Sequence, residues 1–536
     1  MLSANNGFIN FETNLPESKY RKTTLMVNLS DFSLTPVDIQ MMLEAGLNVA
    51  KFRMSRTTKD NRLKLINKIN EAALLCCQKT GVDNWPIATC MVLKTAIIKT
   101  GILKEDLYSI NIKEDTQVIL TCNLSEYDSC DAHKIFVDNN KLTSEVKIGM
   151  EISIGEDEIL LQCIKIRDED SIICKVSKGG RLCNLDRVKM IGVEHKPHSI
   201  TKTDYEIIKF ALEYQVDILI VYYVRQVQTL KTIKKFIGNK VKRPFLISGI
   251  STQQGLNNID EIAKESDAIL MSRNFMPFEL DVSKRLRLGQ IQKWLGAKCE
   301  AHGKPYFLAG DIFQDTLDKG ELSACEVSDV ANAILDGATG FILNEGANVN
   351  YILTALKYID EICRMVEPYK TSKSNFLRVI NEMKVPLNAA EGCILGCVTA
   401  AYQVAASAII IPTVTGYTVQ ALQRISPPCK IIAVTTKTSV MRMLTSCKCI
   451  PLMYTGKPHK IWQMKTDARI QFAVDYAVNR GLISYGDMYV TLQRHSEYSI
   501  YSDTVKIYTT RLAKKPLVEC SNDDDVEEAL QCNLIM

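Results

Sequence analysis

The stretch FLISGISTQQG at residues 245–255 is an apolar run that ends in glycine and hydroxyl residues, and it contains no ionisable side chain. Segments that follow a rigid element are favoured places for binding and catalysis. Electrostatic catalysis needs charges or hydrogen-bond donors aimed at the reacting atoms. Gly249 and Ser251 supply no charge, so this stretch leaves open which chemistry it could support.

Basic and hydroxyl residues lie at the ends of two other apolar runs. Lys51, Arg53 and Ser55 end one run, and Arg225 follows another. Basic residues at a strand end can simply face solvent, and the residues alone leave their role open.

A third candidate site lies in the stretch AIIIPTVTGYT at 408–418. Hydroxyl groups and backbone N–H groups at a helix N-terminus can hold a phosphate, which makes candidates of Thr413, Thr415, Gly416 and Thr418. A plain helix cap is the simpler interpretation, because threonine caps helices routinely.

The composition indicates a soluble, multi-domain protein. The chain has 536 residues, 46% hydrophobic and 24% charged, with a net charge of +4, which is too small to predict a nucleic acid or an anionic membrane as partner. No signal peptide and no membrane span are expected. The 18 cysteines are scattered without zinc spacing, which is typical of free thiols in a reducing cytoplasm.

Short apolar runs alternate with segments of helical periodicity, and this pattern predicts parallel βα units. Eight units favour a closed (β/α)8 TIM barrel over an open doubly wound sheet. The eight predicted strands are 25–29, 48–54, 87–92, 217–223, 244–250, 267–272, 304–310 and 340–345.

About a hundred residues separate the third run from the next helix, and they are rich in short β-like runs, so we predict an all-β insertion. After Glu367 the pattern changes to a second α/β segment with an open sheet. The predicted parts are an N-terminal arm (1–20), the barrel (21–95 and 198–367), the inserted β domain (96–197), a C-terminal α/β domain (368–515) and an acidic disordered tail (516–536).

Four segments resemble the pyruvate kinase family: LEAGLNVAKFRMS (43–55), KGGRLCNLDRVKMIG (178–192), NNIDEIAKESDAILMSR (257–273) and SDVANAILDGA (328–338). The resemblance extends over about residues 20 to 515. It implies a cytoplasmic, glycolytic enzyme that transfers a phosphoryl group from phosphoenolpyruvate to ADP with Mg²⁺ and K⁺, and that assembles as a tetramer.

The same resemblance implies that the catalytic groups have been replaced. The family's phosphoryl-contacting lysine corresponds to Gly249 and its proton-transfer threonine to Gly310. Its two magnesium carboxylates correspond to Ser251 and Phe275. Magnesium is usually held by one or two carboxylates plus substrate phosphates, so no intact magnesium site is expected.

The same resemblance implies that the potassium site of the family is also altered in this chain. Val92 and Leu93 replace two oxygen-bearing residues, and Arg53 and Ser55 are remnants of the cation site. Arg53 could replace the monovalent cation or block its site. Lys51, Ser55 and Arg225 remain as substrate-binding candidates. In the stretch at 408–418 the turn has lost the family's two cations.

We therefore expect a catalytically inactive relative that acts as a binding or oligomer subunit, as a homotetramer or with active relatives. One alternative is an active but impaired, potassium-independent pyruvate kinase. A second is a phosphometabolite sensor that uses Lys51, Ser55 and Arg225.

Overall fold

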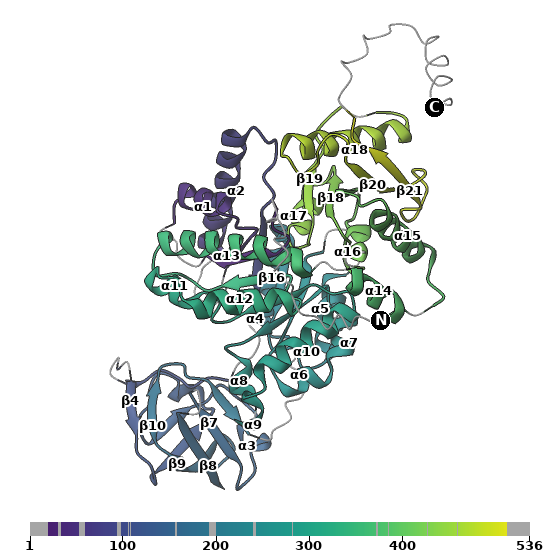
Figure 1. The fold of residues 1–536 in the computed structure, drawn as a ribbon. Coiled ribbons are helices and arrows are strands. Elements are labelled where there is room, and N and C mark those ends of the chain that lie inside the picture. The colour runs from purple at the N-terminus through teal and green to yellow at the C-terminus, as the bar shows by residue number, and fades with distance from the viewer. Residues whose placement is uncertain are drawn as a thin grey trace, which may run out of the picture. The chain divides into compact units, whose positions relative to one another are not determined.

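The computed structural model (Figure 1) describes residues 20–29, 34–52, 59–93, 98–104, 107, 109–155, 158–191, 200–238, 243–280, 282–370, 373–383, 385–425, 427–457 and 459–511. Two predicted site residues, Arg53 and Ser55, lie outside the described residues. The predicted acidic tail and all but the last residue of the predicted N-terminal arm also lie outside them.

Eight strands form a closed barrel in the order β1-β16-β15-β14-β13-β12-β3-β2, and the neighbouring strands run parallel. The predicted (β/α)8 barrel is confirmed, and the open-sheet alternative is excluded. The barrel strands are β1 (Thr24–Asn28), β2 (Val49–Phe52), β3 (Ala88–Val92), β12 (Ile218–Val221), β13 (Phe245–Ile250), β14 (Ala268–Ser272), β15 (Tyr306–Ala309) and β16 (Gly340–Leu343).

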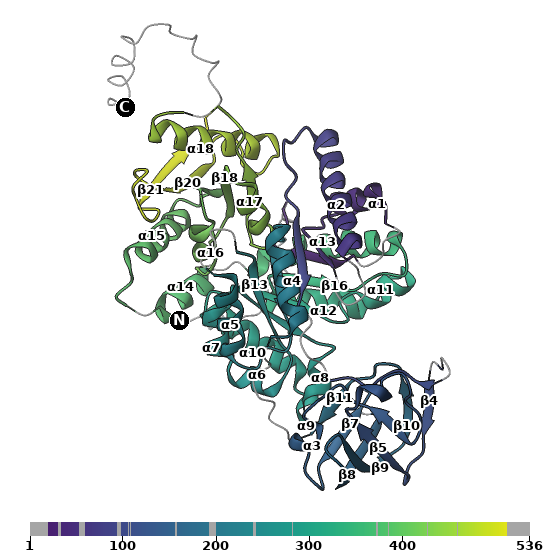
Figure 2. The same ribbon diagram turned by 180° about the vertical axis from the view of Figure 1, so that it is seen from behind.

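Helices surround the barrel, as Figures 1 and 2 show from opposite sides. Several begin with a capping box, in which a hydroxyl side chain and an acidic side chain satisfy the first backbone N–H groups; Thr35 and Asp38 form one, and Ser323 and Glu326 another. The helices are α1 (Pro36–Glu44), α2 (Lys59–Thr80), α4 (Lys202–Glu213), α5 (Val227–Ile237), α6 (Gln253–Asn257), α7 (Ile259–Glu265), α8 (Met276–Glu279), α9 (Val282–Arg285), α10 (Leu288–Ala301), α11 (Gln314–Lys319), α12 (Ala324–Leu335), α13 (Val349–Lys370) and α14 (Lys373–Glu382).

The barrel strands are buried on both faces, which explains why they read as continuous apolar runs. Alternate residues point into the barrel or toward the helices, because side chains alternate across a strand. Val49, Ile247 and Ile342 belong to the cluster inside the barrel. Ala50 and Leu343 belong to the larger cluster between strands and helices. This alternation decides which residues can reach the mouth of the barrel.

The inserted domain follows β3 and is all-β apart from two short helices, as predicted. Its larger sheet has the order β11-β7-β8-β9-β5-β6, and β4 and β10 form a second sheet. The elements are β4 (Ser109–Ile112), β5 (Gln117–Thr121), η2 (Leu124–Glu126), β6 (Lys134–Phe136), α3 (Leu142–Glu145), β7 (Glu151–Ile154), β8 (Ile159–Ile166), β9 (Ser171–Lys178), β10 (Gly180–Cys183) and β11 (Val188–Met190).

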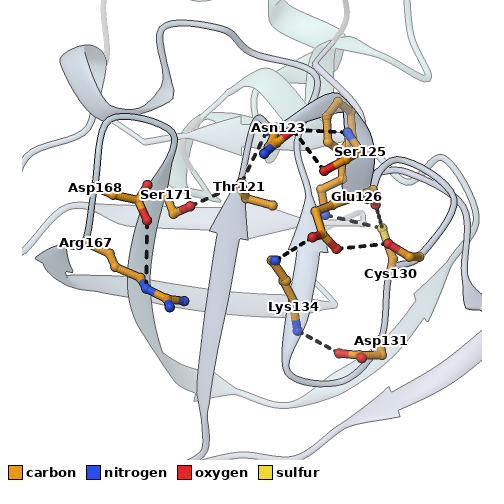
Figure 3. A network of polar contacts seen from close by, with 12 residues as sticks. Thr121, Asn123, Ser125, Glu126, Cys130, Asp131, Lys134, Arg167, Asp168 and Ser171 are labelled. Atoms are coloured by element: carbon orange, nitrogen blue, oxygen red, sulfur yellow. Dashed lines mark hydrogen bonds and ion pairs between the residues drawn. The ribbon is translucent and has the colours of Figure 1, made fainter.

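Polar contacts hold the loops of the inserted domain, as Figure 3 shows. Lys134 Nζ donates to Glu126 Oε1 at 2.7 Å, and the backbone N–H of Lys134 donates to Asp131 Oδ1 at 2.8 Å. Asn123 caps η2 by accepting from the backbone N–H of Ser125. These contacts lie within the connection between β5 and β6 and hold it in place.

The C-terminal segment forms a five-stranded sheet in the order β19-β18-β17-β20-β21, with β21 antiparallel to β20. This confirms the predicted C-terminal α/β domain. Its elements are α15 (Ala389–Gln403), β17 (Ala408–Pro412), α16 (Tyr417–Gln423), β18 (Lys430–Thr435), α17 (Thr438–Leu444), β19 (Ile450–Met453), α18 (Trp462–Asn479), β20 (Met488–Gln493) and β21 (Thr504–Thr509). No helix of the described residues is long and apolar enough to cross a membrane.

By compactness the chain divides into two units. The first contains the barrel, the inserted domain and the segment Lys437–Met453, and the second contains Lys384–Thr436 and the chain from Tyr454 onward. The boundaries proposed between barrel, insertion and C-terminal domain stay predictions.

The segment Lys437–Met453 carries one strong contact within the first unit. Arg442 donates to the buried carboxylate of Asp217 from two nitrogens, at 2.7 and 3.0 Å. It also donates to the hydroxyl of Thr89 at 3.1 Å. Asp217 directly precedes β12, and Thr89 lies in β3. This contact therefore connects α17 to the amino-terminal ends of two barrel strands.

Candidate functional site

The carboxyl ends of the parallel barrel strands meet at one mouth, where (β/α)8 proteins carry their sites. The inward position nearest this mouth can be assigned on each strand from the cluster inside the barrel and from the alternation of side chains. These eight positions are Asn28, Lys51, Val92, Tyr222, Gly249, Ser272, Ala309 and Asn344.

Lys51 is the charged member of this ring of eight residues. Its side chain is buried, with the residue 6% exposed. Burial raises the pKa of the neighbouring Cys90 thiol to about 12, and the charge of Lys51 opposes this rise. The ammonium group therefore lies close to the apolar interior of the barrel, so the predicted binding residue is placed at the mouth.

Gly249 is the residue at which the family resemblance implies a phosphoryl-contacting lysine. A β-carbon on this residue would lie 3.0 Å from Cα of Tyr222 and 3.1 Å from its Cδ1. Tyr222 packs against the cluster inside the barrel. The tyrosine ring thus lies against the space where any side chain of residue 249 would begin.

Ser251 directly follows β13 and is fully buried. Its Oγ makes no hydrogen bond to any described residue. The next residue, Thr252, caps α6 by accepting from the backbone N–H of Gly255 at 3.1 Å. Ser251 presents a neutral hydroxyl at a position where the family resemblance implies a carboxylate.

Phe275 lies in an aromatic cluster at the ends of β12 and β14. Its ring stacks on Tyr223, with centroids 5.6 Å apart and planes 20° from parallel. Tyr222 meets the same ring edge-on, with centroids 5.5 Å apart. The guanidinium carbon of Arg187, from the inserted domain, lies 4.1 Å from the Phe275 centroid.

These residues do not fit the magnesium ion that the family implies. Magnesium needs oxygen ligands, usually one or two carboxylates, and the two positions concerned carry the hydroxyl of Ser251 and the phenyl ring of Phe275. Within the described ranges no three His, Cys, Asp or Glu side chains are grouped as a metal site. An arginine also lies against the Phe275 ring, and its positive charge disfavours a second cation there.

Gly310 follows β15 with φ of +93°, a conformation that other residues seldom adopt. A β-carbon there would lie 2.6 Å from the backbone nitrogen of Asn274 and 2.8 Å from its Oδ1. Asn274 is itself held by Ser272, whose hydroxyl donates to that Oδ1 at 2.8 Å. The neighbouring carboxylate of Asp311 is exposed.

Arg225 was predicted to bind substrate, and the structure gives it a carboxylate partner. Its Nη2 lies 3.9 Å from Oε2 of Glu279 in α8, and both side chains are largely buried. Burial lowers the pKa of Arg225 and raises that of Glu279. Its guanidinium carbon is also 5.8 Å from the Tyr223 centroid.

Arg273 is a neighbour of the candidate site with a structural role. Its two terminal nitrogens donate to the two carboxylate oxygens of Asp329 in α12, each at 2.7 Å. Asp329 belongs to the segment SDVANAILDGA that carries the family resemblance. A bidentate pair of this kind fixes orientation as well as charge, so these residues connect β14 to α12.

Sequence reasoning missed three residues around Phe275: Arg187, Tyr223 and Glu279. Arg187 comes from the inserted domain, more than thirty residues before the next barrel strand begins, so barrel periodicity could not place it at the mouth. The signal that could have found it is the charged stretch Asp186-Arg187-Val188-Lys189, just before the chain returns to the barrel.

The threonine-rich turn lies in the second compact unit. Thr413 Oγ1 accepts from the backbone N–H of Gly416 at 2.9 Å, and Thr415 Oγ1 accepts from that of Tyr417 at 3.4 Å. The hydroxyls of Thr418 and Ser502 lie 3.1 Å apart. The hydroxyls thus already have local partners, and the phosphate-binding role of this turn stays a prediction.

The fold and its mouth define a (β/α)8-barrel protein with an all-β insertion after the third strand and a following α/β domain. The family description "Pyruvate kinase, barrel domain" matches residues 20–356, and "Pyruvate kinase, alpha/beta domain" matches residues 391–508. The chain belongs to the pyruvate kinase family.

The similarity to individual relatives also extends over most of the chain. Human pyruvate kinase PKLR is 27% identical over 490 residues, which cover 91% of this chain and 84% of that protein. Pyruvate kinase 1 of Saccharomyces cerevisiae is 25% identical over 494 residues, covering 92% and 97%. Pyruvate kinase of Candida albicans is 26% identical over 501 residues, covering 93% and 97%. The similarity therefore extends over the barrel, the inserted domain and the C-terminal domain.

Proposed function

We propose that this chain is a pyruvate kinase relative that has lost phosphoryl transfer and acts as a binding or oligomer subunit. The observation that carries the proposal is the aromatic packing of Phe275 on Tyr222 and Tyr223, at a position where the family comparison expects a magnesium carboxylate. A phenyl ring cannot hold the metal, and the neighbouring tyrosines fill the space beside it.

Two further positions support this proposal. Gly249 and Gly310 lack the expected lysine and threonine, and Tyr222 and Asn274 lie against the places where those side chains would start. The space beside both positions is therefore occupied by neighbouring residues. Loss of one preorganised electrostatic group typically lowers the rate about 10²–10³-fold, and such losses are not additive.

A second candidate is an impaired but active enzyme that works without potassium. The buried ammonium of Lys51 at the mouth favours it, because a cation held there could stabilise a phosphoryl group during transfer. Arg53, which could replace the potassium ion or block its site, lies outside the described residues.

Phosphoenolpyruvate and ADP or ATP are the ligands that family membership implies, and we propose them as the first to test. We also propose that the chain is cytoplasmic and forms a tetramer with itself or with active relatives. Co-purification of tagged chain with an active pyruvate kinase would support the mixed assembly. Recovery of the chain as a monomer would contradict it.

The deciding experiment measures pyruvate formation by the purified chain from phosphoenolpyruvate and ADP with Mg²⁺, with and without K⁺. A preparation of Lys51→Met, made in the same host, controls for contaminating host enzyme. We expect equal background rates in both preparations. Turnover above that background, lost in Lys51→Met and independent of K⁺, would favour the impaired enzyme instead.

A further inference from the structure

A cavity of about 400 Å³ lies among the helices outside the barrel strands, where α6 and α7 face α9 and α10. Figures 1 and 2 both show α6, α7 and α10 side by side on the outside of the barrel. A cavity of this size suits a small molecule. Its described lining residues lie outside the ring of eight inward positions at the mouth, so this cavity is separate from the candidate functional site.

An indole ring and three aliphatic side chains form the apolar wall of the cavity. Trp294 of α10 is 41% exposed although it carries the largest side chain in proteins. Ile291 lies three residues before it on the same face of α10, and Leu256 and Ile259 line the cavity from α6 and α7. An accessible ring beside aliphatic groups offers a surface on which a planar aromatic group can stack.

Contacts between α10 and α7 hold the indole in place. Nζ of Lys298 lies 5.7 Å from the centroid of the Trp294 ring, within the range of a cation–π contact. The same ammonium donates to both carboxylate oxygens of Asp260 at 2.9 and 2.8 Å. Nε2 of His302 lies 2.8 Å from Oδ1 of Asp260. A ring that is already held in position loses little freedom when a ligand binds, which favours affinity.

Two cationic side chains line the same cavity, Lys284 from α9 and Arg287 from the start of α10. Asp260 is the carboxylate among the described lining residues. Hydrogen bonds from Lys298 and His302 hold the pKa of Asp260 below its ordinary value, so it is ionised and its charge is matched by Lys298. Lys284 and Arg287 therefore give the cavity a positive edge, which favours an anionic ligand.

Size and chemistry together narrow the class of ligand. An inorganic anion would contact the cations but leave the indole and the aliphatic wall uncovered. A neutral hydrocarbon would cover the apolar wall but leave the cations without a partner. A stable protein partner needs an interface of about 1,000 Å² or more, whereas this cavity has room for a small molecule. A ligand with one aromatic ring system and one carboxylate matches both parts of the lining.

We propose that this cavity binds an aromatic carboxylate, with the ring against Trp294 and the carboxylate toward Lys284 and Arg287. Stacked or edge-to-face rings attract each other beyond the area they bury. Hydrogen bonds between a guanidinium group and a carboxylate are charge-assisted and strong. The inference does not rest on the proposed function, because the cavity shares no residue with the ring at the barrel mouth.

The test is calorimetric titration of the full chain with 2-naphthoate and two matched compounds. In 2-naphthamide the charge is removed and the rings stay, and in cyclohexanecarboxylate the charge stays and the aromatic rings are removed. We expect saturable binding of one 2-naphthoate per chain, with a Kd of about 1 mM or tighter for a ligand of this size. Each matched compound should bind about tenfold more weakly, because it lacks either the charge-assisted hydrogen bonds or the ring contact.

Two variants with matched controls test the residues. Trp294→Ala should weaken 2-naphthoate binding about tenfold, and its control is Tyr498→Ala, at a tyrosine 93% exposed. Arg287→Gln should weaken 2-naphthoate binding about tenfold and leave 2-naphthamide binding unchanged. Its control is Lys264→Gln, at an exposed cation of α7 that does not line the cavity. Both controls should bind as the unaltered chain does.

The inference is overturned if 2-naphthoate does not bind, if 2-naphthamide binds as tightly, or if either variant binds as tightly as its control. A cavity that is instead covered by a second copy of the chain would bind no 2-naphthoate, and Trp294→Ala would then lower the oligomeric size measured by light scattering. That result would also overturn the inference.

Discussion

Cα of Tyr222 lies 3.0 Å from the position that a β-carbon on Gly249 would occupy. Cδ1 of the Tyr222 ring lies 3.1 Å from the same position, so the absence of a side chain at residue 249 and the presence of a large one at residue 222 are linked. Restoring a lysine at 249 places its first carbon against the tyrosine backbone and ring. A single reversion cannot rebuild the catalytic group without moving its neighbour.

We predict that Gly249→Lys destabilises the barrel by about 1–3 kcal/mol, the usual range for overpacking, without producing activity. In a Tyr222→Ser background the same change should cost less, with a coupling of at least about 0.5 kcal/mol between the two sites. Urea unfolding of the unaltered chain, the two single variants and the double variant measures this coupling. Gly289→Lys is the control, because a β-carbon at Gly289 meets nothing within 4 Å; additive effects at 249 and 222 would contradict the linkage.

A second prediction concerns Gly310 and Asn274. Gly310→Thr adds a branched side chain at φ of +93° and places its β-carbon 2.6 Å from the Asn274 nitrogen. Gly149 has nearly the same φ, +91°, with nothing within 4 Å of an added β-carbon. Gly149→Thr should therefore show the backbone strain alone, about 1–2 kcal/mol.

We expect Gly310→Thr to lower the urea midpoint clearly more than Gly149→Thr does. The difference between the two variants reports the overlap with Asn274. Equal effects would mean that Asn274 moves aside freely, and the structure around residue 310 would then be no obstacle to the family's threonine.

The third prediction concerns the buried ion pair between Arg442 and Asp217. Arg442→Ala leaves the Asp217 carboxylate buried with Thr89 as its remaining partner. Breaking a buried pair on one side typically costs about 3–5 kcal/mol, and we expect a loss of this size in the free energy of unfolding. Lys319→Ala, which breaks an exposed pair with Asp315, should leave stability unchanged. A loss no larger than that control would show that α17 contributes little to the barrel.

Much of the fold could be predicted from the sequence because the barrel strands are buried on both faces. Continuous apolar runs such as those at 217–223 and 244–250 then indicate strands directly, and alternation with helices gives the barrel. The position of the inserted domain followed from the length of one connection. These features depend on local pattern and spacing, which a sequence displays.

The candidate site was less predictable, because it depends on contacts between residues far apart in the chain. Periodicity could place Lys51 and Gly249 on strand ends, but it could not show that Tyr222 lies against Gly249. Nor could it bring Arg187 of the inserted domain to the ring of Phe275. Arg225 illustrates the same limit: its charge is visible in the sequence, whereas its partner Glu279 lies more than fifty residues away.

The last prediction concerns pH and the carboxyl of Glu279. Burial raises its pKa, and Arg225, Lys189 and Arg187 oppose this rise. A carboxyl with a raised pKa in the folded state binds its proton more tightly there than in the unfolded chain. Its contribution to stability is present below the unfolded pKa, about 4.3, and is lost as pH rises through the folded pKa.

Glu279→Gln cannot ionise, so it should lose less stability than the unaltered chain as pH rises from about 4 to 8. Glu265→Gln is the opposite control, because Lys234 lowers the pKa of Glu265 by hydrogen bonding. As pH rises over the same range, Glu265→Gln should become less stable relative to the unaltered chain. Urea midpoints at several pH values measure both. If the Glu279→Gln difference is flat, or moves in the same direction as that of Glu265→Gln, the cations around Glu279 outweigh its burial.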